Sequence, residues 1–338
     1  MSTDDDRYQQ DPATPVDDVE VVDAFAHVLP EPFLERMRTA HPSEELAAMD
    51  DDRFWDVERR LADMDAAGID RQVLTLARAS LWRGLDAAEA LALVRAANDA
   101  VAAYAEQSDR FLAVGTLPFL TGEYLDELDR CVRDLGMAGV QVFSNVEGRP
   151  LDDPGHAPFF ERVDRRGVPL WLHPQLHEWH EWDSQHMLHK IFGWPFDTAL
   201  ALGRLACNGV LERHDLDVIA HHAGGMVPHF DERFADMYEG VLDSPEVFPY
   251  EAADLPEPPL SYLREIHGDT VLCGSTHATK CAYDFYGEGM VFATDYPFGP
   301  AGGRRWPRTT VQAVEGIGLA RPARERIYAG TLRELIES

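Results

Sequence analysis

Histidine and aspartate side chains stand at the ends of several apolar segments of this chain. Imidazole nitrogens and carboxylate oxygens are ligands that divalent cations such as Zn²⁺ or Mn²⁺ take in proteins. One such histidine would indicate only a buried, hydrogen-bonded side chain, but several that converge on one place indicate a metal site. The residues concerned are His27, His173, His221, His222 and Asp295.

The elements that must position these side chains follow a regular alternation. Several apolar segments are nearly continuous, which is typical of parallel strands covered on both faces, and helix-like segments separate them. The alternation predicts an α/β fold, a (β/α)8 or TIM barrel. A doubly wound sheet is the alternative, but the first strand runs into AFAHVLPEP without a glycine-rich nucleotide turn. The eight predicted strands are 19–25, 72–77, 111–118, 138–144, 168–174, 216–222, 270–275 and 290–297.

In such a barrel the catalytic groups lie at the carboxyl ends of the strands. The histidines and Asp295 are therefore expected to meet on one rim around a divalent metal. Neighbouring residues of a strand face opposite sides. If His222 faces the site, His221 is expected to have a structural role. Asp23 is expected either to orient a nearby group through a hydrogen bond or to serve packing.

The domain organisation is read from composition. Residues 1–18 are polar and acidic, which predicts a mobile tail, and residues 19–338 are expected to form a single barrel. Two segments, 175–195 and 241–259, are long for loops and are expected to be insertions that act as lids or interfaces. No run of 18 apolar residues predicts a membrane span, and the N-terminus lacks the features of a secretory signal.

The charge balance is unusual, with 60 acidic against 30 basic residues and a formal net charge of −30. Only Lys190 and Lys280 are lysines. Such a chain is a poor partner for nucleic acid and for anionic membrane surfaces. This composition favours a halophilic protein, in which salt screens self-repulsion; an ordinary acidic protein is the alternative. The four scattered cysteines contain no C-x-x-C pair, which favours a reducing, cytoplasmic setting.

Five ordered motifs resemble the amidohydrolase superfamily, and in particular its branch of aminocarboxymuconate-semialdehyde decarboxylase and resorcylate-type aromatic acid decarboxylases. The resemblance spans roughly residues 19–336 and implies a metal-dependent-hydrolase-type (β/α)8 barrel that forms a homodimer. The motifs are VVDAFAHVLPEPF, GVQVFSNVEGRPLDDP, VPLWLHP, DVIAHHAGGMVP and VFATDYPFG.

The resemblance also implies roles for individual residues. His27, His173 and Asp295 match metal ligands, and His222 matches the strand-six histidine, a further ligand or an acid/base. Phe25 stands where the family has the first ligand of its strand-one motif, and a phenylalanine cannot bind a metal. Three protein ligands suffice for many catalytic zinc sites, so a Zn²⁺ or Mn²⁺ site remains the expectation. A metal-free, non-catalytic relative is the further alternative.

Two reactions fit these residues. The metal could hold a substrate carboxylate while Asp295 or His222 protonates the adjacent carbon and CO₂ leaves. Alternatively, a metal-bound hydroxide could attack a lactone, amide or ester, with Asp295 moving the proton. The family branch favours the first, a non-oxidative decarboxylase of a small aromatic or unsaturated carboxylic acid.

Candidates for substrate contact are few. Trp179 in the insertion is expected to cover a planar substrate; an amphipathic helix at a subunit interface and an auxiliary metal site are the alternatives. Arg304 and Arg305 could bind a carboxylate as a fork. Arg53 and Arg60, before the second strand, are expected on a helix surface.

Overall fold

The structure is a computed structural model, and several segments lie outside the residues it describes. The predicted tail falls almost wholly outside them, as do Trp179 and much of both predicted insertions. The described residues are 16, 19–40, 51–77, 82, 84–175, 185–244 and 253–337.

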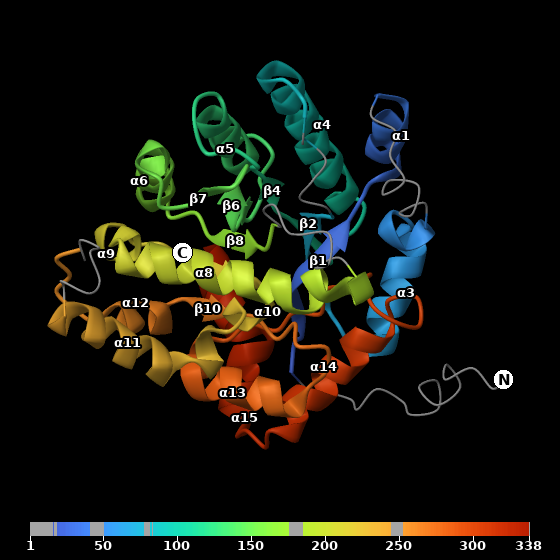
Figure 1. Ribbon diagram of the computed structural model, residues 1–338. Coiled ribbons are helices and arrows are strands. Elements are labelled where there is room, and N and C mark those ends of the chain that lie inside the picture. The colour runs from blue at the N-terminus through green and yellow to red at the C-terminus, as the bar shows by residue number, and fades with distance from the viewer. Residues whose placement is uncertain are drawn as a thin grey trace.

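Parallel strands form the centre of the molecule (Figure 1). One sheet has the order β1 (Val22–Val28), β2 (Arg71–Leu76), β3 (Phe111–Ala113). The second sheet has the order β10 (His267–Gly268), β9 (Val218–Ala220), β8 (Leu170–His173), β5 (Val140–Phe143), β4 (Gly115–Thr116). β3 and β4 are separated only by Val114, whose N–H donates to Leu74 O at 3.0 Å, so the two sheets continue into one another. A separate antiparallel pair consists of β6 (Asn145–Val146) and β7 (Arg149–Pro150).

Backbone hydrogen bonds of residues 291–296 close the ring between β10 and β1. Val291 N donates to Gly268 O at 3.0 Å, next to a parallel bridge between Asp269 and Val291. On the other side, Ala24 N donates to Phe292 O at 2.7 Å, and Asp295 N donates to Phe25 O at 3.0 Å. The sequence prediction of a (β/α)8 barrel is therefore confirmed.

The last two strands differ from the predicted ones. Residues 270–275 are not a strand, because Asp269 Oδ1 accepts from Val271 N at 3.0 Å and Thr270 O accepts from Leu272 N at 2.7 Å. These bonds turn the chain immediately after β10. In 290–297 only Val291 makes a bridge, and Asp295 has a φ of 63°, which no strand residue adopts.

Helices surround the strands (Figure 1). α3 begins at an N-cap, Asp56, and α4 begins with a capping box of Asp86 and Glu89. Gly68 and Gly167 end α3 and α6 in the left-handed conformation, which glycine adopts without strain. The helices are α1 (Glu31–Ala40), α3 (Val57–Ala67), α4 (Ala87–Ala105), α5 (Tyr124–Arg133), α6 (Ala157–Arg166), α8 (Trp194–Cys207), α9 (Val210–Arg213), α10 (His221–Gly224), α11 (Asp231–Asp243), α12 (Pro259–Glu265), α13 (Thr276–Tyr286), α14 (Arg305–Gly316), α15 (Arg321–Glu325) and α16 (Thr331–Glu337).

Two apolar clusters make up the core. The larger cluster fills the space between strands and surrounding helices. The smaller one joins interior residues such as Phe25 and Trp171 to Val22 near the start of β1, and to Leu332 and Leu335 of α16. α16 therefore covers the amino ends of the strands, and the carboxyl ends carry the polar groups. Among the described helices, none is long and apolar enough to cross a membrane.

Candidate metal centre

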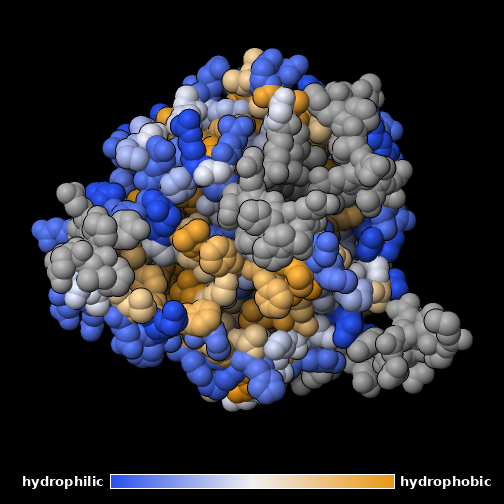
Figure 2. Space-filling model, in the orientation of Figure 1, coloured by the Kyte–Doolittle hydropathy of each residue, from blue (hydrophilic) through white to orange (hydrophobic). Residues whose placement is uncertain are grey.

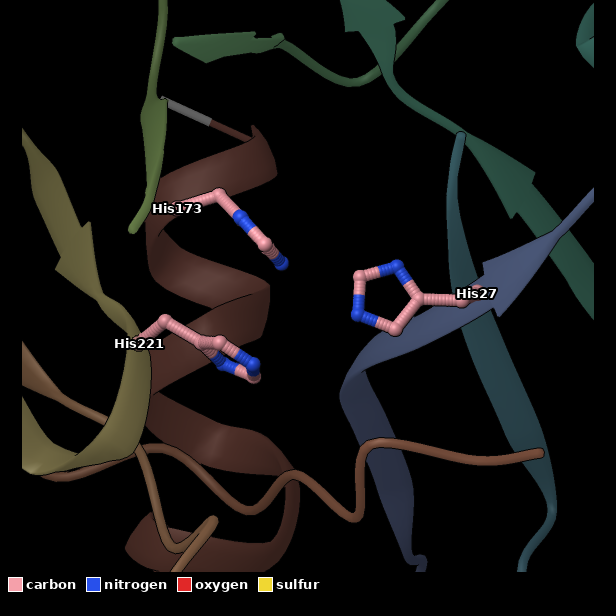
Figure 3. A group of neighbouring side chains, drawn as sticks. All are labelled: His27, His173 and His221. Carbon is pink, nitrogen blue, oxygen red and sulfur yellow. The ribbon is translucent and has the colours of Figure 1, made fainter. Parts of the chain in front are cut away.

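Three histidines from three barrel strands point toward one place (Figure 3). His27 lies on β1, His173 ends β8, and His221 follows β9. One candidate ligand atom from each lies within 4.8 Å of the other two. Asp295 joins them, since its Oδ1 is 3.0 Å from His27 Nε2 and 3.6 Å from His221 Nε2.

The other ring nitrogen of each of these histidines is held by a hydrogen bond. His173 Nδ1 lies 2.7 Å from Pro174 O, and His221 Nδ1 lies 2.7 Å from Asp269 Oδ2. Both oxygens are acceptors, so both Nδ1 atoms donate. His27 Nδ1 is 2.8 Å from Thr75 Oγ1, whose hydroxyl is directed at Ala26 O and therefore accepts from the ring. In its neutral form each of these imidazoles would therefore present an Nε2 lone pair, the arrangement that outer hydrogen bonds impose on metal-ligating histidines.

His27 Nε2 supports this assignment. Despite its 3.0 Å approach to Asp295 Oδ1, it has no partner of hydrogen-bonding geometry among the described residues, and it is buried. A buried nitrogen without a partner is costly, and a cation shared with Asp295 would satisfy both groups. The donor set of imidazoles and one carboxylate fits Zn²⁺ or Mn²⁺.

Electrostatics keep two of the histidines neutral. Burial lowers the pKa of His27, and burial together with His221 and His27 holds the pKa of His173 well below its usual value. Burial also lowers the pKa of His221, but the Asp269 and Asp295 carboxylates together outweigh it and raise that pKa to about 9. A cation at His221 Nε2 would replace this proton, because a ligating imidazole is neutral. Burial would raise the pKa of Asp295, but His221 and His27 outweigh it and hold that pKa below its ordinary value.

The structure corrects the expectation that His221 points away from the site. β9 ends at Ala220, so strand alternation no longer applies at the next residue. His222 and Ala223 have φ values of 53° and 54°, and this turn brings His221 beside Asp295. His222 also stays near, with its ring centroid 4.0 Å from that of His221. Its buried Nδ1 has no hydrogen-bond partner among the described residues.

Aromatic rings line the centre. Phe25 is fully buried, and its ring centroid lies 4.1 Å from that of His221 and 5.5 Å from that of His27. Phe298 contacts His27 at a centroid distance of 5.3 Å, and Trp194 lies 6.3 Å from His173. Phe25 belongs to the apolar barrel interior and forms a floor beneath the histidines.

Two other predicted substrate residues follow the Asp295 segment. Arg304 is exposed, and Arg305 is half-buried at the start of α14. Burial and Asp295 raise the pKa of Cys273, while Arg305 opposes them, which places Arg305 near that thiol. Trp179 lies outside the described residues.

Sequence reasoning missed two buried residues behind the site. Arg60 was expected on a helix surface, but it is fully buried and its Nη2 donates to His27 O at 2.6 Å. Its spacing from Met64 and Ala67, at i+4 and i+7, is the signal of a shared buried face. Asp269 was overlooked because the predicted seventh strand began after it, at residue 270, whereas β10 begins at His267.

Asp23, whose role the sequence left open, is a hydrogen-bond acceptor. It accepts from Phe25 N at 3.3 Å, Gln72 Nε2 at 3.0 Å, and both Thr294 N and Thr294 Oγ1. Burial raises its pKa to about 6, against the lowering effect of these bonds.

Comparison with known proteins gives consistent matches. The sequence model of the amidohydrolase family matches residues 22–335. The 2-amino-3-carboxymuconate-6-semialdehyde decarboxylase of Dictyostelium discoideum is 31% identical over 252 residues, which is 73% of this chain and 68% of that protein. The gamma-resorcylate decarboxylase of Rhizobium sp. (strain MTP-10005) is 34% identical over 195 residues, covering 52% of this chain and only 58% of the relative.

Solved structures share the fold. 5-Carboxyvanillate decarboxylase LigW from Sphingomonas paucimobilis superimposes with a TM-score of 0.81 at 22% identity, over 94% of this chain and 99% of that one. The enzyme of the same name from Novosphingobium aromaticivorans, complexed with manganese and 4-hydroxy-3-methoxy-5-nitrobenzoic acid, gives a TM-score of 0.80 at 22% identity, over 95% and 97%.

Proposed function

Because the chain belongs to the amidohydrolase family, we propose that it is a metal-dependent, non-oxidative carboxy-lyase of a small aromatic or unsaturated carboxylic acid. The observation that carries the proposal is the set of three imidazoles, each anchored at Nδ1, that meet beside Asp295. The decarboxylase names of the relatives favour this reaction over hydrolysis of a lactone, amide or ester. Residues 19–338 form a single barrel domain in this proposal.

His27, His173 and Asp295 are the proposed metal ligands, and His221 is added to them on the basis of its position. Bound there, Zn²⁺ or Mn²⁺ supplies the positive charge that holds a carboxylate and an adjacent oxygen. The manganese found with a structural neighbour supports a divalent ion here. The aromatic rings around the centre, Phe25 among them, favour a planar substrate.

The chain's own acid groups complete the reaction. The bond between the carboxylate carbon and the adjacent substrate carbon breaks, and its electron pair stays on that adjacent carbon. The same carbon takes a proton through His222 or Asp295 as CO₂ leaves. Burial and His221 hold the pKa of His222 well below its usual value, and the pKa of Asp295 is also low, so either group first takes from solvent the proton that it passes to the carbon. His222 is suited to this step because its Nδ1 makes no hydrogen bond within the described residues. Trp179, Arg304 and Arg305 are proposed to contact the substrate.

Two measurements test this function: the metal content of the purified protein and its release of CO₂. Purified protein is expected to hold about one equivalent of Zn²⁺ or Mn²⁺ and to release CO₂ from hydroxybenzoic acids, with both properties lost on chelation. His173→Ala is the matched variant, expected to lose metal and activity together. Less than about a tenth of an equivalent, with no gain on adding either ion, would identify a metal-free relative. Acid release from lactones without CO₂ release would identify a hydrolase.

A homodimer is proposed from an exposed apolar face. Its members along α8 and the turn before it include Phe192, Phe196 and Leu200, which follow one another at four-residue intervals. Phe230 and Met237 of the α11 region are also exposed, and apolar residues gather on this side of the molecule in Figure 2. Patches of this kind mark association surfaces. Sedimentation velocity would show a single monomer species if this assignment is wrong.

Two further proposals concern the setting of the protein. The cysteine pattern supports a cytoplasmic location, and fractionation of cells is the test. The charge of −30 and the two lysines support a halophilic protein.

A further inference from the structure

Arg60 is a fully buried guanidinium that donates three hydrogen bonds, all of them to neutral oxygens. Nε donates to Tyr104 OH at 3.2 Å, Nη1 to Gln72 Oε1 at 3.1 Å, and Nη2 to His27 O at 2.6 Å. Its Cζ also lies 4.9 Å from the ring centroid of Tyr296. The side chain thus contacts the main chain of one candidate metal ligand and the residue that follows another.

Gln72 connects this cation to a buried carboxylate. Its Oε1 accepts from Arg60, and its Nε2 donates to Asp23 Oδ2 at 3.0 Å, so the amide can serve both only in one orientation. Asp23 in turn accepts from Thr294 Oγ1 at 2.6 Å and from Thr294 N at 3.0 Å. Thr294 immediately precedes Asp295. The chain of bonds therefore runs from His27 to the main chain beside Asp295.

These bonds lie where the strands are joined less regularly than elsewhere. Within the described residues, β1 and the segment 291–296 share three backbone hydrogen bonds, including one from His27 N to Tyr296 O at 2.6 Å, whereas β1 and β2 form a parallel ladder. A metal site needs its ligands held to about 0.5 Å. Burying an arginine and an aspartate for packing alone is unfavourable, since apolar side chains of similar size fill a core at least as well.

We propose that Arg60, Gln72 and Asp23 form a positioning relay that holds His27 and Asp295 at the separation a divalent metal requires. The inference rests on the proposed metal site. The relay does not contact the substrate and acts only through His27 and Asp295. Its loss is expected to weaken metal binding beyond what the loss of stability explains.

Gln72→Leu tests the relay, and Asn98→Leu is its matched control. Asn98 is likewise a buried amide, and its hydrogen bonds within the described residues join the Glu127 carboxylate to Thr116 of β4, away from the metal centre. Both variants are expected to lower the melting temperature. In calorimetric titration with Mn²⁺, Gln72→Leu should bind about tenfold more weakly, while Asn98→Leu should stay within about twofold of wild type. Equal Mn²⁺ affinity in all three proteins would overturn the relay.

Two milder substitutions at Thr294 test the relay even if Gln72→Leu does not fold. Thr294→Val removes the hydroxyl bonded to Asp23 at nearly constant volume, and Thr294→Ser keeps it. Thr294→Val is expected to bind Mn²⁺ several-fold more weakly, with affinity restored in Thr294→Ser; wild-type affinity in Thr294→Val counts against the relay. Failure of the wild-type protein itself to bind Mn²⁺ or Zn²⁺ overturns the proposed function, a result distinct from normal binding in the variants.

Discussion

Three hydrogen-bond acceptors outside the ligand set orient the rings of His27, His173 and His221 toward one place. A threonine hydroxyl, a proline carbonyl and an aspartate carboxylate each hold one Nδ1. Because each partner accepts the Nδ1 proton, the tautomer of the neutral ring is set, and Nε2 is left for a cation. The chemistry of the site therefore depends on Thr75 and Asp269 as well as on the imidazoles.

Substitution of Phe25 tests whether position 25 can supply a further metal ligand. Its ring lies against His221 and close to His27. Phe25→His is expected to tighten Mn²⁺ binding by about tenfold, because a further imidazole would reach the centre. The same change should lower the free energy of unfolding, because it places a polar ring in the apolar barrel floor.

Phe25→Leu is the control for this substitution. It is expected to cost about 1 kcal/mol in stability while leaving Mn²⁺ affinity unchanged, as a shape change in a packed core does. Titration of the three proteins with Mn²⁺ decides the matter. If Phe25→His binds no more tightly than Phe25→Leu, position 25 is not a ligand position.

At the scale of elements, the turn after β9 decides which groups face the metal. Gly225, with a φ of 68°, lies against the start of α8, and a Cβ there would stand 1.9 Å from Pro195 O. Gly224 is similarly close to the Tyr286 hydroxyl. The glycine pair therefore permits tight packing of this turn against α8 and Tyr286.

Gly225→Ala is predicted to be strongly destabilising. Gly318→Ala is the control, since Gly318 has a similar φ of 72° but nothing within 4 Å of an added Cβ. Gly318→Ala should cost about 1–2 kcal/mol, the price of a left-handed alanine. Gly225→Ala should cost at least about 2 kcal/mol more because main chain must move. Urea unfolding measures both, and equal losses would mean that the contact with Pro195 is unimportant.

For the whole molecule, net charge is the dominant property. The chain carries 60 acidic and 30 basic residues, so acid side chains outnumber the cations that could pair with them. At about 0.1 M salt the Debye length is about 10 Å, and the surplus carboxylates repel one another across the surface. At 1 M it is about 3 Å, and most of that repulsion is screened.

The melting temperature is therefore expected to rise steadily with KCl. Differential scanning calorimetry across a KCl series measures it, with sucrose at matched osmolality as the control for exclusion effects. Full native circular dichroism in dilute buffer, with a melting temperature independent of KCl, would leave an ordinary acidic protein as the better description.

Local pattern was enough to predict much of this protein. The alternation of apolar and helix-like segments predicts the barrel and six of its strands within a few residues, because this signal depends on neighbours in sequence. The same pattern predicts His27 and His173 near the ends of β1 and β8, whereas Asp295 lies in the irregular segment after Val291 instead of at the predicted strand end. The family motifs indicate a metal centre and a decarboxylase.

Only the tertiary structure decided which side chains support that centre. Where β9 and β10 stop depends on hydrogen bonds to other strands and to the Asp269 carboxylate, so the turn that brings His221 inward is invisible to strand alternation. Arg60 is buried because β1, β2 and the Tyr296 ring converge on it from distant parts of the chain. The i+4 and i+7 spacing places Arg60 on a buried helix face, but the partners it meets there come from distant segments that leave no local signal. These contacts determine which polar groups lie beside the metal ligands.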